Sequence, residues 1–306
     1  MRIVVALGGN ALLRRGQKPD ADVQEENVRR AVTALAPLAD GHELVMTHGN
    51  GPQVGVLALQ SASDPRLTTP YPFDVLGAQT QGMIGYWLLQ GLQNRLSDRH
   101  VAAVINQTLV DVADPAFADP TKFVGETYDR HEANRIAAER DWVIKPDGAG
   151  WRRVVPSPHP RRVVETALIR QLIEVGAVVV CAGGGGVPVV RNEAGDLEGV
   201  EAVVDKDRAS ALLAIEMNAD LLMIPTGVER VAIRFGAPDQ QWLDRIGIEQ
   251  AERFMAEGHF GEGSMRPKIE ALLTFVKGRA GGRGVITNPE NIARALRGET
   301  GTWIER

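Results

Sequence analysis

Residues 175–190 constrain the fold of this chain more than any other stretch, because a run of apolar, mostly β-branched residues ends there in four consecutive glycines. Such a run is typical of a strand that is buried on both faces. Four glycines supply no packing and cost backbone entropy, so they are expected where bare N–H groups or positive φ angles are needed. We therefore predict a buried strand followed by a loop whose backbone binds an anion.

Two other apolar runs end in the same way. Residues 3–7 lead into Gly8-Gly9-Asn10, and residues 44–46 lead into Thr47-His48-Gly49-Asn50-Gly51. A tight turn would be the favoured interpretation of one such loop alone. Three glycine-rich strand ends instead predict one shared crevice.

Composition excludes several classes of protein. The 306 residues, 44% of them hydrophobic, suit one large α/β domain or two smaller ones with a sizeable core. The formal charge of −5 and the lack of a block of like charge disfavour a nucleic-acid partner. Cys181 is the single cysteine, which excludes an internal disulfide, and its apolar neighbours favour a packed hydrophobic role.

The amino-terminal sequence has no signal-peptide layout, and no apolar segment is long enough for a membrane span. We therefore expect a cytoplasmic protein without a membrane partner.

Strand and helix patterns alternate along the first half of the chain. Asp22 and Glu25 form a capping-box pattern at the start of a helix that should end near Asp40. A valine-rich strand is expected over residues 101–112, with a break near Asn106-Gln107. Further elements are expected as a strand over 44–48 and helices over 54–61 and 75–96.

The pattern changes between residues 113 and 160, where prolines and charged residues are frequent. This segment holds a short helical pattern over 131–140 and a strand-like pattern over 151–155. We interpret it as a small subdomain, inserted at the edge of the sheet within a single domain of residues 1–306.

The alternation then resumes. A helix closes at Gly176, and residues 188–191 and 198–204 form a predicted hairpin. Ser264 should cap a later helix, and Asn288-Pro289 should open the last one. The remaining elements are predicted as a helix over 205–217 and strands over 221–225, 231–235 and 284–287. Repeated strand and helix alternation predicts a mainly parallel sheet with helices on both faces.

The anion is not held by the two commonest nucleotide loops, because neither a Walker A pattern nor a GxGxxG fingerprint is present. Phosphoryl transfer needs in-line positioning and positive charge over the transferring oxygens, which lysines and backbone donors supply. The chain has six lysines, and Lys206 and Lys268 stand out because each lies at a helix start. A solvated surface lysine is an equally weighted alternative for each.

Several long, ungapped motifs resemble those of the carbamate kinases and span residues 2–304. They are VVALGGNA at 4–11, HGNGPQVG at 48–55, TQGMIGYW at 80–87, WRRVVPSP at 151–158, GGGGVPVV at 183–190, GVEAVVDKD at 199–207, TGV at 226–228, GHF at 258–260 and GSMRPKIEA at 263–271. The resemblance implies the amino acid kinase fold, a three-layer αβα sandwich on a mostly parallel open sheet. It also implies reversible phosphoryl transfer between carbamoyl phosphate and ADP, or ATP and carbamate, with Mg²⁺ accompanying the nucleotide, and a homodimer.

The same resemblance implies roles for individual residues. Related kinases place a lysine in the loop after the first strand, where this chain has Ala6-Leu7, and carbamate kinases supply one from the inserted segment instead. The implied catalytic residues are Lys122, Lys206 and Lys268, with Asp207 orienting the lysines. The implied phosphoryl- and substrate-binding residues are Gly8, Gly9, Asn10, Asn50, Gly51, Gly183, Gly184, Gly185 and Gly186, and those near the nucleotide are Asp205, Thr226, Gly227, Val228, Met265 and Pro267.

One departure from the family pattern concerns the loop after Lys122, where the usual prolines are replaced by residues 123–127, FVGET. His48 is interpreted as structural, and the histidines lack ligand spacing, so no metal held by the protein is expected. The alternatives are another small-molecule kinase of the same fold, or a nucleotide-sensing module without activity.

Overall fold

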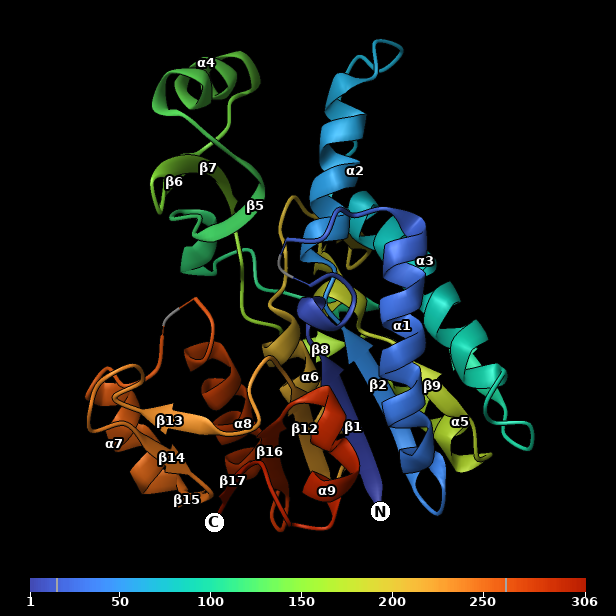
Figure 1. Ribbon diagram of the computed structural model, residues 1–306. Helices are drawn as coiled ribbons and strands as arrows, with labels where there is room; N and C mark the ends of the chain where they lie inside the picture. The colour runs from blue at the N-terminus through green and yellow to red at the C-terminus, as the bar shows by residue number, and fades with distance from the viewer. Residues whose placement is uncertain (15, 262) are drawn as a thin grey trace.

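The computed structural model describes residues 1–14, 16–261 and 263–306 and is built around an eight-stranded sheet (Figure 1). The strand order is β15-β17-β16-β12-β1-β2-β9-β3. β17 runs antiparallel to β16, whereas β3, β9, β2, β1, β12 and β16 are mutually parallel. The strands are β1 (Arg2–Leu7), β2 (Glu43–His48), β3 (Val101–Ala103), β9 (Val178–Val180), β12 (Leu221–Pro225), β15 (Arg245–Gly247), β16 (Arg283–Thr287) and β17 (Thr302–Glu305).

The central strand β1 shows why the sheet is covered on both sides. Ile3 and Val5 lie in one buried apolar cluster, and Val4 and Ala6 lie in the other, because successive side chains of a strand point to opposite faces. Helices α1 (Ala21–Leu35), α3 (Phe73–Gln93) and α9 (Ile292–Leu296) contribute to the first cluster, and α5 (Thr166–Glu174), α6 (Lys206–Glu216), α7 (Ile248–Ala256) and α8 (Arg266–Gly278) to the second. The predicted three-layer αβα architecture on a mostly parallel sheet is confirmed.

Two predicted helix caps are wrong. α1 begins at Ala21, and the Asp22 carboxylate accepts the N–H of Val23 instead of capping the helix. α8 begins at Arg266, and Ser264 lies in the preceding turn, in which the N–H groups of residues 264–266 all bond to the carbonyl of Gly261. The observed caps, Asp20 and Met265, lie within two residues of the predicted ones, and at α1 the predicted capping carboxylate is engaged by the N–H of its neighbour instead.

The valine-rich stretch after α3 is broken as predicted, and the break separates two sheets. β3 is the edge strand of the large sheet, whereas β4 (Gln107–Leu109) joins a four-stranded sheet of order β11-β10-β4-β8. Its other strands are β8 (Arg162–Val163), β10 (Val187–Arg191) and β11 (Leu197–Gly199). β10 and β11 form the predicted antiparallel hairpin, although β11 ends earlier than expected.

The segment that the sequence marks as inserted folds into a sheet of its own. β5 (Lys122–Tyr128), β7 (Gly150–Val155) and β6 (Ile144–Asp147) pair in that order, and α4 (Arg130–Arg140) lies above them at the upper left of Figure 1. Val124 and Val155 join Val54 and Phe73 in a small apolar cluster, so the segment is packed against the main body through α2 (Gly51–Ser63) and α3.

The predicted strand over 231–235 is β13 (Val231–Ile233), which pairs with β14 (Gln241–Leu243). The sequence patterns did not predict β14, α7, β15 or β17. In the described part of the chain, none of the helices combines the length and apolar character that a membrane span needs.

Candidate active site

The three glycine-rich loops lie together at the carboxyl edge of the sheet. They follow β1, β2 and β9, which are adjacent in the strand order. A Cβ placed on Gly49 would come within 3.0 Å of the Gly9 nitrogen, and one on Gly183 within 2.4 Å of the His48 ring. The three loops are therefore brought together, in the position where open α/β sheets bind ligands, and a crevice lined by all three stays a prediction.

The tetraglycine provides the positive φ angles that the sequence predicts, and it also lets neighbouring side chains approach closely. Gly183–Gly185 form a buried 3₁₀ turn, and Gly184, Gly185 and Gly186 all have positive φ. A Cβ on Gly184 would lie 2.2 Å from the Asn50 amide, and one on Gly186 would lie 2.1 Å from the Thr108 hydroxyl. The protein's own side chains thus occupy the space beside these glycines, and the absent Cβ atoms let them approach the turn.

A second anchor of the site is the amino-terminal end of α6. The Asp205 carboxylate caps this helix, because its Oδ1 accepts the N–H groups of Asp207 at 2.9 Å and Arg208 at 3.2 Å. Lys206 follows in the first turn, and its ammonium donates to the carbonyl of Ala6, at the end of β1, at 3.0 Å. The sequence Asp-Lys-Asp therefore fixes a lysine between the helix start and the central strand.

Three lysines and two aspartates meet at this point. Asp207 binds two of the ammonium groups, Lys206 through Oδ1 at 2.7 Å and Lys268 through Oδ2 at 3.0 Å. Lys122 reaches over from β5 of the inserted segment and pairs with Oδ2 of Asp205 at 2.7 Å. The structure thus brings together all four residues predicted to be catalytic, in a cluster with an excess of one positive charge.

The ionisation of this cluster follows from its burial and its pairing. Burial raises the pKa of Asp207, but Lys206 and Lys268 outweigh that effect and hold the pKa below its usual range. Asp205 follows the same logic: burial raises its pKa, and the neighbouring Lys122 and Lys206 lower it further than burial raises it. Burial also lowers the pKa of Lys206, against the opposing effect of Asp207. Both carboxylates therefore stay ionised and hold the ammonium groups in fixed directions.

A cleft of about 1010 Å³ opens beside the lysine cluster. Gly8, Gly9 and Lys268 line its inner end, and Thr226, Gly227, Val228 and Met265, which were predicted to lie near the nucleotide, line its wall. Asp205 and Pro267, from the same predicted set, are not among the described residues that line it. The cleft has the size of a small-molecule site.

The predicted residues of the other two glycine loops are not among the described residues that line the cleft. Asn50 is buried at the start of α2, and its amide donates to the Thr80 hydroxyl at 2.8 Å, which fixes its orientation. Gly51 begins α2, and Gly183, Gly184, Gly185 and Gly186 face this loop. The side chain of Asn10 lies outside what the structure describes.

Two polar residues that the sequence analysis did not assign hold the tetraglycine in place. Asn106 is fully buried, and its Oδ1 accepts the N–H of Ala182, whose backbone is left-handed with φ of 48°, at 2.5 Å. Thr108 donates to the carbonyl of Gly185 at 2.8 Å. Their signal in the sequence was the polar break in the valine-rich run.

His48 is buried, as expected of the structural role that the sequence suggests. Its side chain is 1% exposed, and burial, the largest influence, lowers its pKa to about 4. The neutral ring lies against Gly183 and contacts the carbonyl of Gly49.

The described side chains offer few ligands for a metal ion. In the described residues there is no group of three or more His, Cys, Asp or Glu side chains with the geometry of a metal site. Magnesium is commonly held by nucleotide phosphates and water with one or two carboxylates, so this donor set fits an ion that arrives with the nucleotide.

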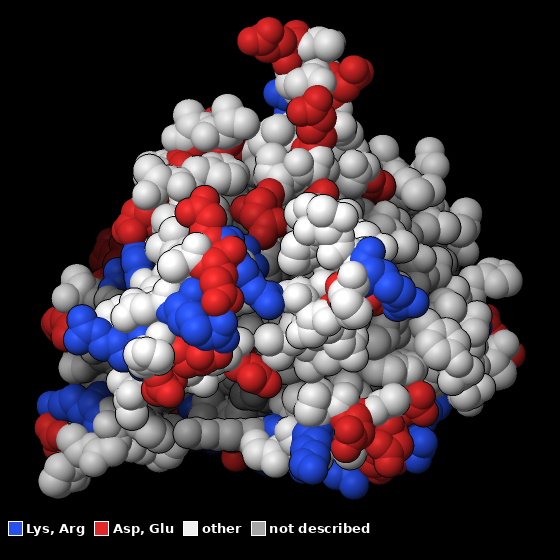
Figure 2. All heavy atoms as spheres, turned by 90° about the horizontal axis from the view of Figure 1, so that it is seen from above, with Lys and Arg blue, Asp and Glu red and all other residues white. Residues whose placement is uncertain are grey.

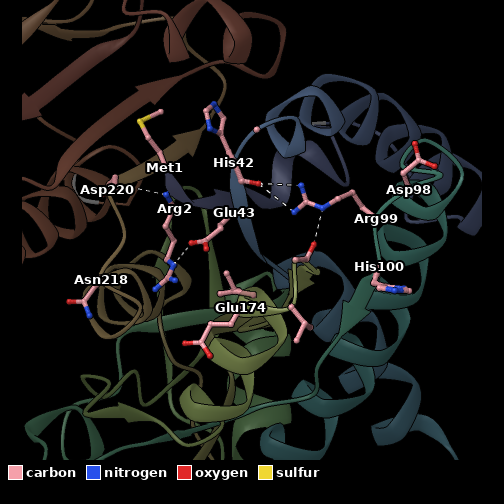
Figure 3. Close-up of a pocket in the computed structure, with 14 residues that line it drawn as sticks. Met1, Arg2, His42, Glu43, Asp98, Arg99, His100, Glu174, Asn218 and Asp220 are labelled. Carbon is pink, nitrogen blue, oxygen red and sulfur yellow. Dashed lines mark hydrogen bonds and ion pairs between the residues drawn. The ribbon is translucent and has the colours of Figure 1, made fainter.

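A second cavity of about 860 Å³ lies at the opposite, amino edge of the sheet (Figure 3). Its arginines are already engaged: Arg2 pairs with Glu43 at 2.8 Å, and Arg99 donates to the carbonyls of Ala39 at 2.6 Å and Gly176 at 2.8 Å. These guanidinium groups bind the protein's own backbone and a carboxylate, and hold the starts of neighbouring segments together.

The sequence of the chain is similar to those of known kinases. A model of the amino acid kinase family matches residues 1–288. The chain is 48% identical to the carbamate kinase of Pyrococcus horikoshii over 311 residues, which cover 99% of this chain and 98% of that protein. It is 46% identical to the carbamate kinase of Haemophilus influenzae over 307 residues, covering 100% and 97%.

Solved structures agree as well. The carbamate kinase from Giardia lamblia bound to AMP-PNP matches with a TM-score of 0.92 and 38% identity, covering 99% of this chain and 98% of that one. The chain therefore belongs to the amino acid kinase family and, within it, to the carbamate kinases.

Proposed function

We propose that this chain transfers a phosphoryl group between carbamoyl phosphate and ADP, forming carbamate and ATP, and catalyses the reverse reaction through the same site. The observation that carries the proposal is the cluster of Lys122, Lys206 and Lys268 around Asp205 and Asp207 at the carboxyl edge. The similarity to carbamate kinases over the whole chain supports the choice of substrate.

The step itself needs little covalent chemistry from the protein. A β-phosphate oxygen of ADP forms a bond to the phosphorus of carbamoyl phosphate, and the bond from that phosphorus to the carbamate oxygen breaks. The leaving carbamate takes the electron pair and the negative charge. The ammonium groups of Lys206 and Lys268 stabilise the charge that spreads over the transferring oxygens, and Asp207 keeps them in position.

The two reactants approach from opposite sides of the cluster. The nucleotide occupies the cleft along Thr226, Gly227, Val228 and Met265, where Gly8 and Gly9 meet its terminal phosphate. The carbamoyl group lies toward Asn50 and the tetraglycine turn. In-line transfer requires the transferring phosphoryl to lie between the two oxygens, and this proposed arrangement meets that requirement.

We propose Mg²⁺ as the accompanying ion. It would bind the nucleotide phosphates and neutralise part of their charge. The positive charge that the protein itself supplies to the transferring group would then come from the lysines.

A substrate panel tests this proposal. The purified protein should form ATP from carbamoyl phosphate and ADP, and a chelator should abolish ATP formation. Phosphorylation of an acylamino acid or a nucleoside monophosphate with only background ATP formation would establish another kinase of this fold. Nucleotide binding without transfer to any of these acceptors would establish a sensing module.

We further propose that residues 113–160 act as a lid that carries Lys122 to the site and excludes water. The support is that Lys122 lies on β5 of the separate small sheet and yet pairs with Asp205 of the main body. Lys145 is a matched control, because it pairs with Asp119 at 2.6 Å in the same segment, away from the cluster.

Two measurements separate a lid from a rigid appendage. Lys122→Ala should lose most of its turnover, whereas Lys145→Ala should stay near wild type. Hydrogen exchange across the segment should slow most when ADP and a carbamoyl phosphate analogue bind together. Equal turnover of the two variants, with exchange unaffected by ligands, would contradict the lid.

We also propose a homodimer in the cytoplasm. The edge strand β3 is followed by Ile105, which is 57% exposed, and Tyr86 on the neighbouring helix α3 is 53% exposed, so this edge offers apolar surface to a second copy. Sedimentation should give the mass of two chains for wild type and of one for Ile105→Glu. A wild-type monomer at micromolar concentration would contradict this proposal, and cell fractionation tests the location.

A further inference from the structure

The short segment between β11 and α6 contacts the lid at three places. Glu201 accepts from Arg153 of β7 at 2.9 Å, Val203 donates its N–H to the carbonyl of Pro156 at 3.0 Å, and Asp205 binds Lys122 of β5 at 2.7 Å. Three contacts within five residues therefore join the small sheet to the start of α6.

Lys122 is held differently from the other two lysines of the cluster. The side chains of Lys206 and Lys268 are 10% and 16% exposed and share Asp207, whereas the side chain of Lys122 is 39% exposed. The partner that the structure gives the Lys122 ammonium is Asp205. The direction of this ammonium thus depends on one carboxylate.

Asp205 is itself held rigidly. Its Oδ1 is bound by two backbone N–H groups of α6, and its side chain is 14% exposed, so its Oδ2 points to a fixed place beside the helix start. Asp205 thus fixes the direction of the Lys122 ammonium, as Asp207 fixes the ammonium groups of Lys206 and Lys268.

We infer that Asp205 is a positioning residue, which brings the ammonium of Lys122 to the transferring phosphoryl each time the lid lies over the crevice. This role rests on the proposed phosphoryl transfer. Asp205 was expected among the nucleotide-binding residues, and the inference replaces that expectation with a contact to the lid lysine.

The test is a double-mutant cycle of Asp205→Asn and Lys122→Ala. Asparagine keeps an oxygen for the two N–H groups of α6, as a good capping residue, and removes the charge that binds Lys122. Glu201→Gln is the matched control, because it removes a lid charge pair while leaving an oxygen for the N–H of Phe73.

We expect Asp205→Asn to lower kcat by about tenfold to a hundredfold, since a misplaced catalytic group costs a loss of this order. Lys122→Ala should lose about a hundredfold or more, and the double variant should be no slower than Lys122→Ala within about threefold. ADP affinity should be unchanged, and Glu201→Gln should keep kcat within about threefold of wild type.

Two results would overturn the inference. One is a kcat of Asp205→Asn equal to that of wild type. The other is a loss in the double variant that multiplies the two single losses, because independent effects would mean that Asp205 acts through helix stability rather than through Lys122.

Hydrogen exchange separates this inference from the proposed function. Exchange in Lys122–Tyr128 should rise equally in Asp205→Asn and Lys122→Ala, whether or not ATP is formed. If wild type forms no ATP from carbamoyl phosphate but exchange rises in both variants, the proposed function fails and the contact between Asp205 and the lid stands. If ATP forms and exchange stays at the wild-type level in Asp205→Asn, the inference fails alone.

Discussion

The two edges of the central sheet carry similar cavities and very different chemistry. At the amino edge, Arg2 pairs with the Glu43 carboxylate, and Arg99 donates to the backbone carbonyls of Ala39 and Gly176. These contacts hold the strand starts together. At the carboxyl edge, the cations are lysines held by two aspartates, beside glycine loops and a cleft. Positive charge alone therefore does not identify a phosphoryl site. What distinguishes the carboxyl edge is that its cations lie beside glycine loops and a cleft.

The outer surface above the carboxyl edge supports the same distinction. Figure 2 views the molecule from above, and the Lys and Arg side chains on this face are interspersed with Asp and Glu. The charge that matters is thus gathered inside the site rather than spread over the surface, which suits a small anionic substrate better than a large polyanion.

The largest expected effect comes from Asp207→Ala. This change leaves the ammonium groups of Lys206 and Lys268 without their shared partner, so turnover should fall by about a hundredfold or more while ADP binding weakens much less. Asp119→Ala, which removes the exposed partner of Lys145, is the control and should be silent. An Asp207→Ala enzyme within about threefold of wild type would place the chemistry elsewhere.

Gly184→Ala should have the next largest effect. The new methyl group would lie 2.2 Å from the Asn50 amide at a residue whose φ is 62°, so Asn50 must move. We expect the KM for carbamoyl phosphate to rise by about tenfold or more, with ADP affinity retained. Gly82→Ala in α3 is the control, because its Cβ meets no atom within 4 Å. An unchanged KM in Gly184→Ala would remove the tetraglycine from the substrate side.

A smaller effect is expected from pH, through His48. Its pKa is lowered from 6.5 to about 4, so the unfolded chain binds more protons between these values and stability falls as pH drops from 6.5 toward 4. The loss should be at most about 3 kcal/mol. Denaturant unfolding across this range measures it, and His48→Gln should flatten the slope. A wild-type slope that matches the variant would show that His48 is not buried in its neutral form.

Arg99→Ala should change catalysis least. It removes the bonds to Ala39 and Gly176 at the amino edge, so the free energy of unfolding should fall by about 2 kcal/mol. The KM values and kcat should match wild type at temperatures where the variant is folded. A loss of turnover without loss of stability would contradict the claim that the amino edge takes no part in the reaction.

The sequence predicted the parts of this molecule that rest on local patterns. The apolar runs that end in glycines located β1, β2 and β9, whose loops lie together, because parallel strands buried on both faces leave a clear signal. Resemblance then identified Lys122, Lys206, Lys268 and Asp207, which the fold brings into one cluster.

The sequence missed what depends on contacts between distant segments. Asp205 is 83 residues from Lys122, and Asn106 is 76 residues from Ala182, so no spacing rule could pair them. The sequence located the glycine-rich turns, but the side chains that fill the space beside the glycines come from other segments of the chain. The start of α1 was misplaced because the N–H of Val23 bonds to the Asp22 carboxylate, and the start of α8 because a backbone turn onto the Gly261 carbonyl precedes the helix.

The most direct test of the central claim is the initial rate of ATP formation from carbamoyl phosphate and MgADP by wild type and Lys206→Ala, with ADP affinity measured calorimetrically on both. Lys206 is the lysine that bonds both Asp207 and the end of the central strand. Wild type should form ATP, and Lys206→Ala should lose about a hundredfold or more in rate with ADP affinity within about threefold. Equal rates for the two proteins would contradict the account, because the lysine cluster would then not carry the transfer.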